Sequence, residues 1–140
     1  MITNAKLIPV APYFVSNIDG EYFVANQREV KDANLPPFDK HLIFLATQRE
    51  INLNYREIRI ILPKTLEFKT YLLSDLDPSV HFEYIEDVGV IRVYKGIEGS
   101  ITLFESNTPN SLAATFKVTV EDDNHNTKLE VNGDFDMLLS

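Results

Sequence analysis

Apolar and polar residues alternate with a period of two along most of this chain. In the clearest segment, Ala114 to Val120, one face carries Phe116, Val118 and Val120 and the other carries Thr115, Lys117 and Thr119. Successive side chains of a β-strand point to opposite faces, so this alternation predicts strands with one buried face. A helical period is nearly absent. Residues 44–51 are the best helix candidate, but the apolar run before them favours a strand.

Turn residues separate the expected strands. Asp19-Gly20 lies between two apolar runs and predicts a hairpin, because glycine accepts the positive φ that such a turn requires. Residues 26–40 are expected to form a long surface loop, because Pro36-Pro37 cannot join a central sheet. A turn-rich connection is expected at Ser74–Ser79, a short turn between Gly96 and Gly99, and a bulge or tight turn at Asn132-Gly133.

The order of these segments predicts the fold class. Strands are expected at 13–15, 21–25, 41–47, 54–62, 67–73, 80–85, 90–94, 100–104, 114–120, 127–131 and 134–139. Many short strands with one apolar face predict an all-β protein in which two layers hide their apolar sides from water. We therefore predict a single domain over residues 1–140, built as an antiparallel two-sheet β-sandwich, with a partly closed β-barrel as the alternative.

Charge limits the classes of partner. The chain has 21 acidic and 13 basic side chains, a formal net charge of −8. Nucleic acid is not an expected partner, because its binding needs clustered Lys and Arg. The close pair Arg56 and Arg59 belongs to an expected strand. An anionic membrane surface is disfavoured for the same reason.

The expected location depends on the start of the chain. Residues 1–10 do not resemble a signal peptide, because their apolar run is short and Pro9 breaks it. No segment approaches the ~20 apolar residues of a transmembrane helix. The protein is expected to be cytoplasmic or particle-associated if Met1 is native, and on the cell surface if a leader has been removed.

Residue types that carry catalysis or bind metals form no recognisable pattern. The chain has no cysteine, which excludes disulfides and thiol nucleophiles. A triad would need one of three scattered histidines, His41, His81 and His125, and there is no Gly-x-Ser-x-Gly elbow. Two acidic clusters, Asp75 with Asp77 and Asp122 to Asn124, suit turns better than calcium. We therefore assign no catalytic residue, cofactor site or metal site.

Aromatic residues leave two interpretations open. Tyr84 and Tyr94 are possible ligand contacts if they are exposed, because aromatic faces stack on sugars. Packing in the core is the other interpretation.

Short motifs spread over residues 13–139 resemble an uncharacterised family of small bacterial β-sandwich domains that are often surface lipoproteins. The motifs are Ile18–Ala25, Ile58–Leu62, Thr70–Leu72, Gly99–Leu103, Ala114–Val118 and Asn132–Phe135. The resemblance implies a sandwich and a cell-envelope setting, and it brings no catalytic residues. The chain departs from this family in lacking an exported leader and a lipid-bearing cysteine.

These observations predict a non-enzymatic structural or protein-binding module, a subunit of a larger bacterial surface or particle assembly. A protein partner or self-association is expected, because sheet edges can accept a further strand. The alternative is a carbohydrate-binding domain that uses exposed aromatics, so a glycan is a second possible ligand. A hydrolase with paired carboxylates, such as Glu83 and Glu130, is the third hypothesis.

Overall fold

The computed structural model describes residues 10–33, 40–52, 54–73, 80–124 and 126–139. Within these ranges the chain forms ten β-strands: β1 (Tyr13–Ile18), β2 (Glu21–Val24), β3 (Gln27–Ala33), β4 (His41–Arg49), β5 (Tyr55–Pro63), β6 (Thr70–Leu73), β7 (His81–Asp87), β8 (Ile91–Glu105), β9 (Ser111–Asp122) and β10 (Lys128–Leu138). All their pairings are antiparallel. The all-β prediction is therefore confirmed, and residues 44–49 form part of a strand.

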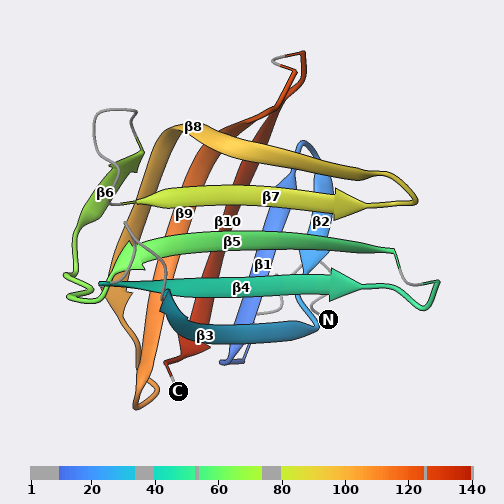
Figure 1. Cartoon of the computed structure of the whole chain (residues 1–140). Helices are drawn as coiled ribbons and strands as arrows, with labels where there is room; N and C mark the ends of the chain where they lie inside the picture. Colours follow the sequence, from blue (N-terminus) through green and yellow to red (C-terminus); the bar gives the residue numbers. More distant parts are fainter. Residues whose placement is uncertain (1–9, 34–39, 53, 74–79, 125, 140) are drawn as a thin grey trace, which may run out of the picture.

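The strands belong to one strongly curled sheet, so the prediction of a two-sheet sandwich is wrong. Their order is β2-β1-β10-β9-β8-β7-β5-β4-β3, with β6 paired to β8. The sheet forms a half-barrel, in which β3, β4, β5 and β7 pass in front of β9, β10 and β1 at a steep angle (Figure 1). Alternation predicts one buried face per strand, and a curled single sheet meets that requirement as well as two separate sheets do.

The curl depends on β8, which continues through the turn that we predicted between Gly96 and Gly99. Its first part pairs with β7 and its second part with β6, while β9 follows it across a β-bulge between Gly96 and Glu98. A bulge bends a strand without ending it. Gly99 has a φ of 131°, and a Cβ there would lie 2.2 Å from the Lys117 carbonyl oxygen. Gly96 therefore lies at a bend of β8 and Gly99 at a close approach of β8 to β9, and neither residue forms a loop.

Other local predictions have mixed outcomes. The hairpin at Asp19-Gly20 is confirmed, with positive φ at both residues. The expected loop 26–40 is wrong for residues 27–33, which form β3, and Asn132-Gly133 lies inside the continuous strand β10. Pro36-Pro37 and Ser74–Ser79 lie outside the described residues.

The core fills the inside of the curled sheet. Ile58, Ile60 and Leu62 of β5 point into it, as the alternation predicts, and all three are fully buried. Phe135 of β10 stacks on Phe14 of β1 and packs 5.5 Å from Phe44 of β4, measured between ring centroids. These contacts join the front strands to the back strands.

None of the described segments forms a helix of the length and apolarity needed to cross a membrane.

Candidate functional site

The two aromatic residues singled out from the sequence lie in the core. Tyr84 on β7 and Tyr94 on β8 are cross-strand partners, with ring centroids 5.6 Å apart, and they are only 1% and 2% exposed. Burial raises the pKa of Tyr84, whose hydroxyl donates to Glu86 at 3.1 Å. The core interpretation therefore holds for both residues, and neither ring face is open to a ligand in this structure.

Of the described residues considered for catalysis or metal binding, only His41 and His81 are brought near each other. His41 and His81 lie on β4 and β7, and His125 lies outside the described residues. Partial burial lowers the pKa of His81, the charge of Glu83 opposes that shift, and the charge of His41 contributes to the lowering. Among the described residues there is no group of three or more side chains able to hold a metal.

Of the two acidic clusters, the one at Asp122 lies within the described residues, and it has a structural role there. The Asp122 carboxylate accepts hydrogen bonds from the backbone of Asn126 and Thr127, so it shapes the β9–β10 turn. Asp75 and Asp77 lie outside the described residues. Glu83 and Glu130 lie on β7 and β10, which are separated in the sheet by β8 and β9.

Hollows in the described surface are shallow and poorly suited to chemistry. The depression over β8, β9 and β10 has a volume of about 400 Å³ and is lined by Glu98, Lys117 and Thr119 among others. The Thr119 hydroxyl in it donates to Glu130 at 2.7 Å. A second hollow, of about 380 Å³, lies beside Pro12, Val30 and Leu138. The first hollow does place the Thr119 hydroxyl beside the Glu130 carboxylate, but the pair is solvent-exposed and the shallow hollow does not exclude water.

A different feature stands out on the outside of the front strands. We call it the front face: the side chains of β3, β4, β5, β7 and the first part of β8 that point away from the core. Its members are Gln27, Glu29, Lys31, Ala33, His41, Ile43, Leu45, Thr47, Arg49, Tyr55, Glu57, Arg59, Ile61, Pro63, His81, Glu83, Ile85, Asp87, Ile91, Val93 and Lys95. They alternate with core residues such as Phe44, Ile60 and Tyr84, which fixes their direction.

Two aliphatic groups lie on the front face, on opposite sides of the charged pair Arg59 and Glu83 at its centre. Ile43, Leu45 and Ile61 are half-buried neighbours on β4 and β5, and we call them the β4–β5 group. Ile85 and Val93 are cross-strand partners on β7 and β8, and we call them the β7–β8 group. A sheet face turned to water is ordinarily polar, whereas strands covered on both sides are apolar throughout. The two aliphatic groups, and not the front face as a whole, therefore have the composition of a surface that is covered.

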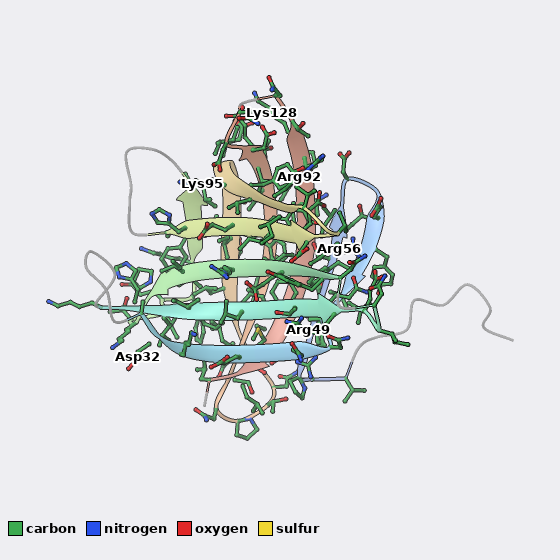
Figure 2. All side chains as sticks on the ribbon, turned by 45° about the vertical axis from the view of Figure 1, so that its right-hand side comes forward. Asp32, Arg49, Arg56, Arg92, Lys95 and Lys128 are labelled. Carbon is green, nitrogen blue, oxygen red and sulfur yellow. The ribbon has the colours of Figure 1, made fainter. Side chains whose placement is uncertain are left out.

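Charged groups on the front face alternate in sign across the strands. Register places Glu29, Leu45, Arg59, Glu83 and Lys95 in one row from β3 to β8. The Arg59 guanidinium also lies 2.6 Å from Glu57, whose carboxylate accepts from the Thr47 hydroxyl at 3.0 Å. Figure 2 shows Lys95 and Arg49 at separate places on the front strands. The cations therefore do not gather into one basic patch.

This face was not among the site residues expected from the sequence, although a signal for it exists. Residues 41–46 and 58–62 are almost continuously apolar, with Ile43, Leu45 and Ile61 at the positions opposite the core. Such runs are typical of strands that are buried on both faces. We interpreted them only as one-sided strands.

Comparisons with protein-family models, with curated proteins and with solved structures found no match to this chain, so the resemblance to surface lipoprotein domains stays a prediction.

Proposed function

We propose that this chain is a non-enzymatic protein-binding module, a subunit of a larger assembly, and that the front face is its binding surface. The observation that carries the proposal is the pair of aliphatic groups on that face. Ile43, Leu45, Ile61 and Val93 point away from the core and are only partly covered, whereas Ile85 between them is 6% exposed and adds little surface. Burying apolar surface at about 25 cal/mol per Å² would favour a partner that covers it.

The rim of the face suits a protein partner. Charges of both signs lie beside the aliphatic groups: Glu29 and Lys95 at the two outer strands of the face, and Arg59 between the groups. Protein interfaces commonly combine an apolar centre with a polar rim that sets orientation. A setting in a bacterial surface or particle assembly is part of this proposal and rests on the family resemblance.

The carbohydrate-binding alternative draws no support from Tyr84 and Tyr94, because both rings are buried. Exposed rings occur elsewhere, at Tyr22 (66%), Phe68 (63%) and Phe104 (46%), and none of them is an aromatic on which this alternative was based. We therefore do not put it forward as a second function.

Site-specific photocrosslinking tests the proposal. A photoreactive phenylalanine analogue at Leu45 is expected to yield crosslinked protein in extracts of the source cells, because this side chain lies in the middle of the front face. The same analogue at Thr115, which is exposed on the back strand β9, is the matched control and should yield none. Equal crosslinking from both positions, or none from Leu45, would contradict the proposal.

A further inference from the structure

We propose that the partner on the front face is a second copy of this chain, packed face to face about a two-fold axis. This inference rests on the proposed function and names the partner of the same surface. Two properties of the front face lead to it, its charge balance and the placing of its two aliphatic groups, and its size limits the affinity.

Charge balance distinguishes this face from the rest of the molecule. It carries four carboxylates and four cations: Glu29, Glu57, Glu83 and Asp87 against Lys31, Arg49, Arg59 and Lys95. The face has no net formal charge, so the whole chain's charge of −8 falls on other surfaces. Two copies would repel each other through those surfaces, while the front faces can meet without net repulsion.

The aliphatic groups are placed so that each can cover the other. Arg59 and Glu83 are cross-strand partners at the middle of the face. The β4–β5 group lies on one side of this pair, and the β7–β8 group lies diagonally across it, displaced toward the β7–β8 hairpin. A two-fold axis in the interface, over the pair and roughly 45° to the strands, exchanges these two positions.

Specific contacts follow from that arrangement. Strands of the two copies would cross at about 90°, which is one of the two common ways in which sheets pack. Val93 of one copy then lies over Ile43 of the second copy, and Ile85 lies over Leu45. The Arg59–Glu83 pairs of the two copies cross at the axis, where Arg59 is equally near the second copy's Arg59 and Glu83, so each guanidinium must turn toward the second copy's carboxylate. Each contact occurs twice, as a two-fold interface requires.

The size of the face limits how tight such a contact is. Five strands about 4.8 Å apart and residues of one face about 7 Å apart along each strand give an area of roughly 600 Å². A standard protein interface buries ≈ 800 Å² of accessible surface per partner, and this face, on the outer side of a curled sheet, falls below that size. We therefore expect a reversible dimer.

Cysteine crosslinking tests this arrangement, because the chain has no cysteine of its own. Val93→Cys and Ile43→Cys are made as separate variants, mixed and oxidised. The mixture is expected to give a disulfide-linked dimer much faster than either variant alone. Val93→Cys mixed with Thr115→Cys, on the back strand β9, is the matched control and should crosslink slowly. Within one copy, β4 and β8 are about three strand spacings apart, roughly 14 Å, so no internal disulfide competes.

Analytical ultracentrifugation of the unmodified chain supplies a second readout that no engineered cysteine can disturb. A monomer–dimer equilibrium is expected, with the dimer weakened at least tenfold by Leu45→Arg and unaffected by Thr115→Arg. A monomer at concentrations up to about 1 mM would overturn the inference. So would a dimer that is insensitive to Leu45→Arg, or disulfide formation that favours the Thr115→Cys control.

The two proposals fail in distinguishable ways. Suppose that the purified chain stays monomeric while the analogue at Leu45 crosslinks to another protein in cell extract. The proposal of a dimer is then overturned, and the proposal of a protein-binding front face is retained. If Leu45 gives no crosslink in either the purified protein or the extract, both proposals are overturned.

Discussion

Gly133 lies where β10 runs closest to its neighbours. A Cβ at this position would lie 2.4 Å from the Val15 carbonyl oxygen and 2.7 Å from the ring of Phe116. Glycine within a strand often marks such a close approach, which explains why Asn132-Gly133 was mistaken for a turn in the sequence. Only the position of the neighbouring strands separates the two interpretations.

We expect Gly133→Ala to lower the free energy of unfolding by about 1–3 kcal/mol, because the added methyl group forces β1 or Phe116 to move. Chemical denaturation measures the change. Asn132→Ala, at the exposed neighbouring position, is the control and should change stability by less than about 0.5 kcal/mol. Equal effects of the two variants would contradict the close approach.

Tyr13 and Asp134 form a second local arrangement that the sequence did not indicate. The Tyr13 hydroxyl donates to the Asp134 carboxylate at 2.9 Å. Burial, followed by this hydrogen bond and the charge of Asp134, raises the pKa of Tyr13 to about 12 from its ordinary value of 10.0.

The folded protein therefore holds the Tyr13 proton more tightly than the unfolded chain does. The resulting stability is fully present below pH 10 and is lost as the pH rises toward 12. An NMR titration of labelled tyrosines should show Tyr13 titrating late, and Asp134→Asn should bring its pKa back toward 10. A Tyr13 pKa that stayed high in Asp134→Asn would leave burial as the main cause and remove Asp134 from the explanation.

Strands β2 and β5 show how elements far apart in the sheet order are held together. Arg56 on β5 donates to the Tyr22 carbonyl oxygen of β2 at 2.8 Å and to the Gln48 side chain of β4, and its guanidinium lies 5.5 Å from the centroid of the Phe23 ring. Figure 2 shows Arg56 at the end of the front strands nearest to the β1–β2 hairpin. The Arg56 side chain is 17% exposed, whereas that of Glu21, 3.5 Å away, is 81% exposed. The hydrogen bonds therefore matter more than the ion pair.

Arg56→Gln is expected to destabilise the fold by about 1.5–3 kcal/mol and to speed hydrogen exchange in β2 before other strands. Arg56→Lys should not restore stability, because an ammonium group cannot reach both acceptors in the fixed geometry of a guanidinium. Arg92→Gln, at an exposed position on β8, is the control. Uniform acceleration of exchange in all strands would count against a local link.

The element that sequence analysis missed altogether is β3. Its residues, Gln27 to Ala33, are mostly charged or polar and five of the seven are exposed, so they carry no alternation. An edge strand needs little apolar surface, and charged side chains on it discourage pairing with other chains. The polar composition of residues 27–33 therefore indicated a loop, whereas their pairing with β4 makes this segment a strand.

At the scale of the whole molecule, the curl is closed by aromatic contacts across the interior. Phe135 of β10 contacts Phe14 of β1 and Phe44 of β4, with centroid distances of 5.4 and 5.5 Å. β4 and β10 lie far apart along the sheet order, so this contact depends on the curl and not on strand pairing.

Phe135→Ala should cost about 3–5 kcal/mol of unfolding free energy, because it leaves a cavity between the front and back strands. Phe104→Ala is the matched control: Phe104 is 46% exposed on β8, and its removal should cost less than about 1 kcal/mol. Urea denaturation of both variants gives the comparison. Similar losses in the two would show that the interior contact does not hold the curl.

The sequence by itself determined the β class, the positions of most strands, the inward residues of β9, and the hairpin at Asp19-Gly20, because alternation and turn chemistry are local properties of the chain. Only the tertiary structure decided that the strands form one curled sheet, that Tyr84 and Tyr94 are buried, and that Ile43, Leu45 and Ile61 gather with Ile85 and Val93 on one outer face. The physical reason is that the two-residue alternation of apolar and polar side chains shows only which residues share a face of one strand. Which strands become neighbours, and how far the sheet bends, depend on contacts between residues far apart in the chain.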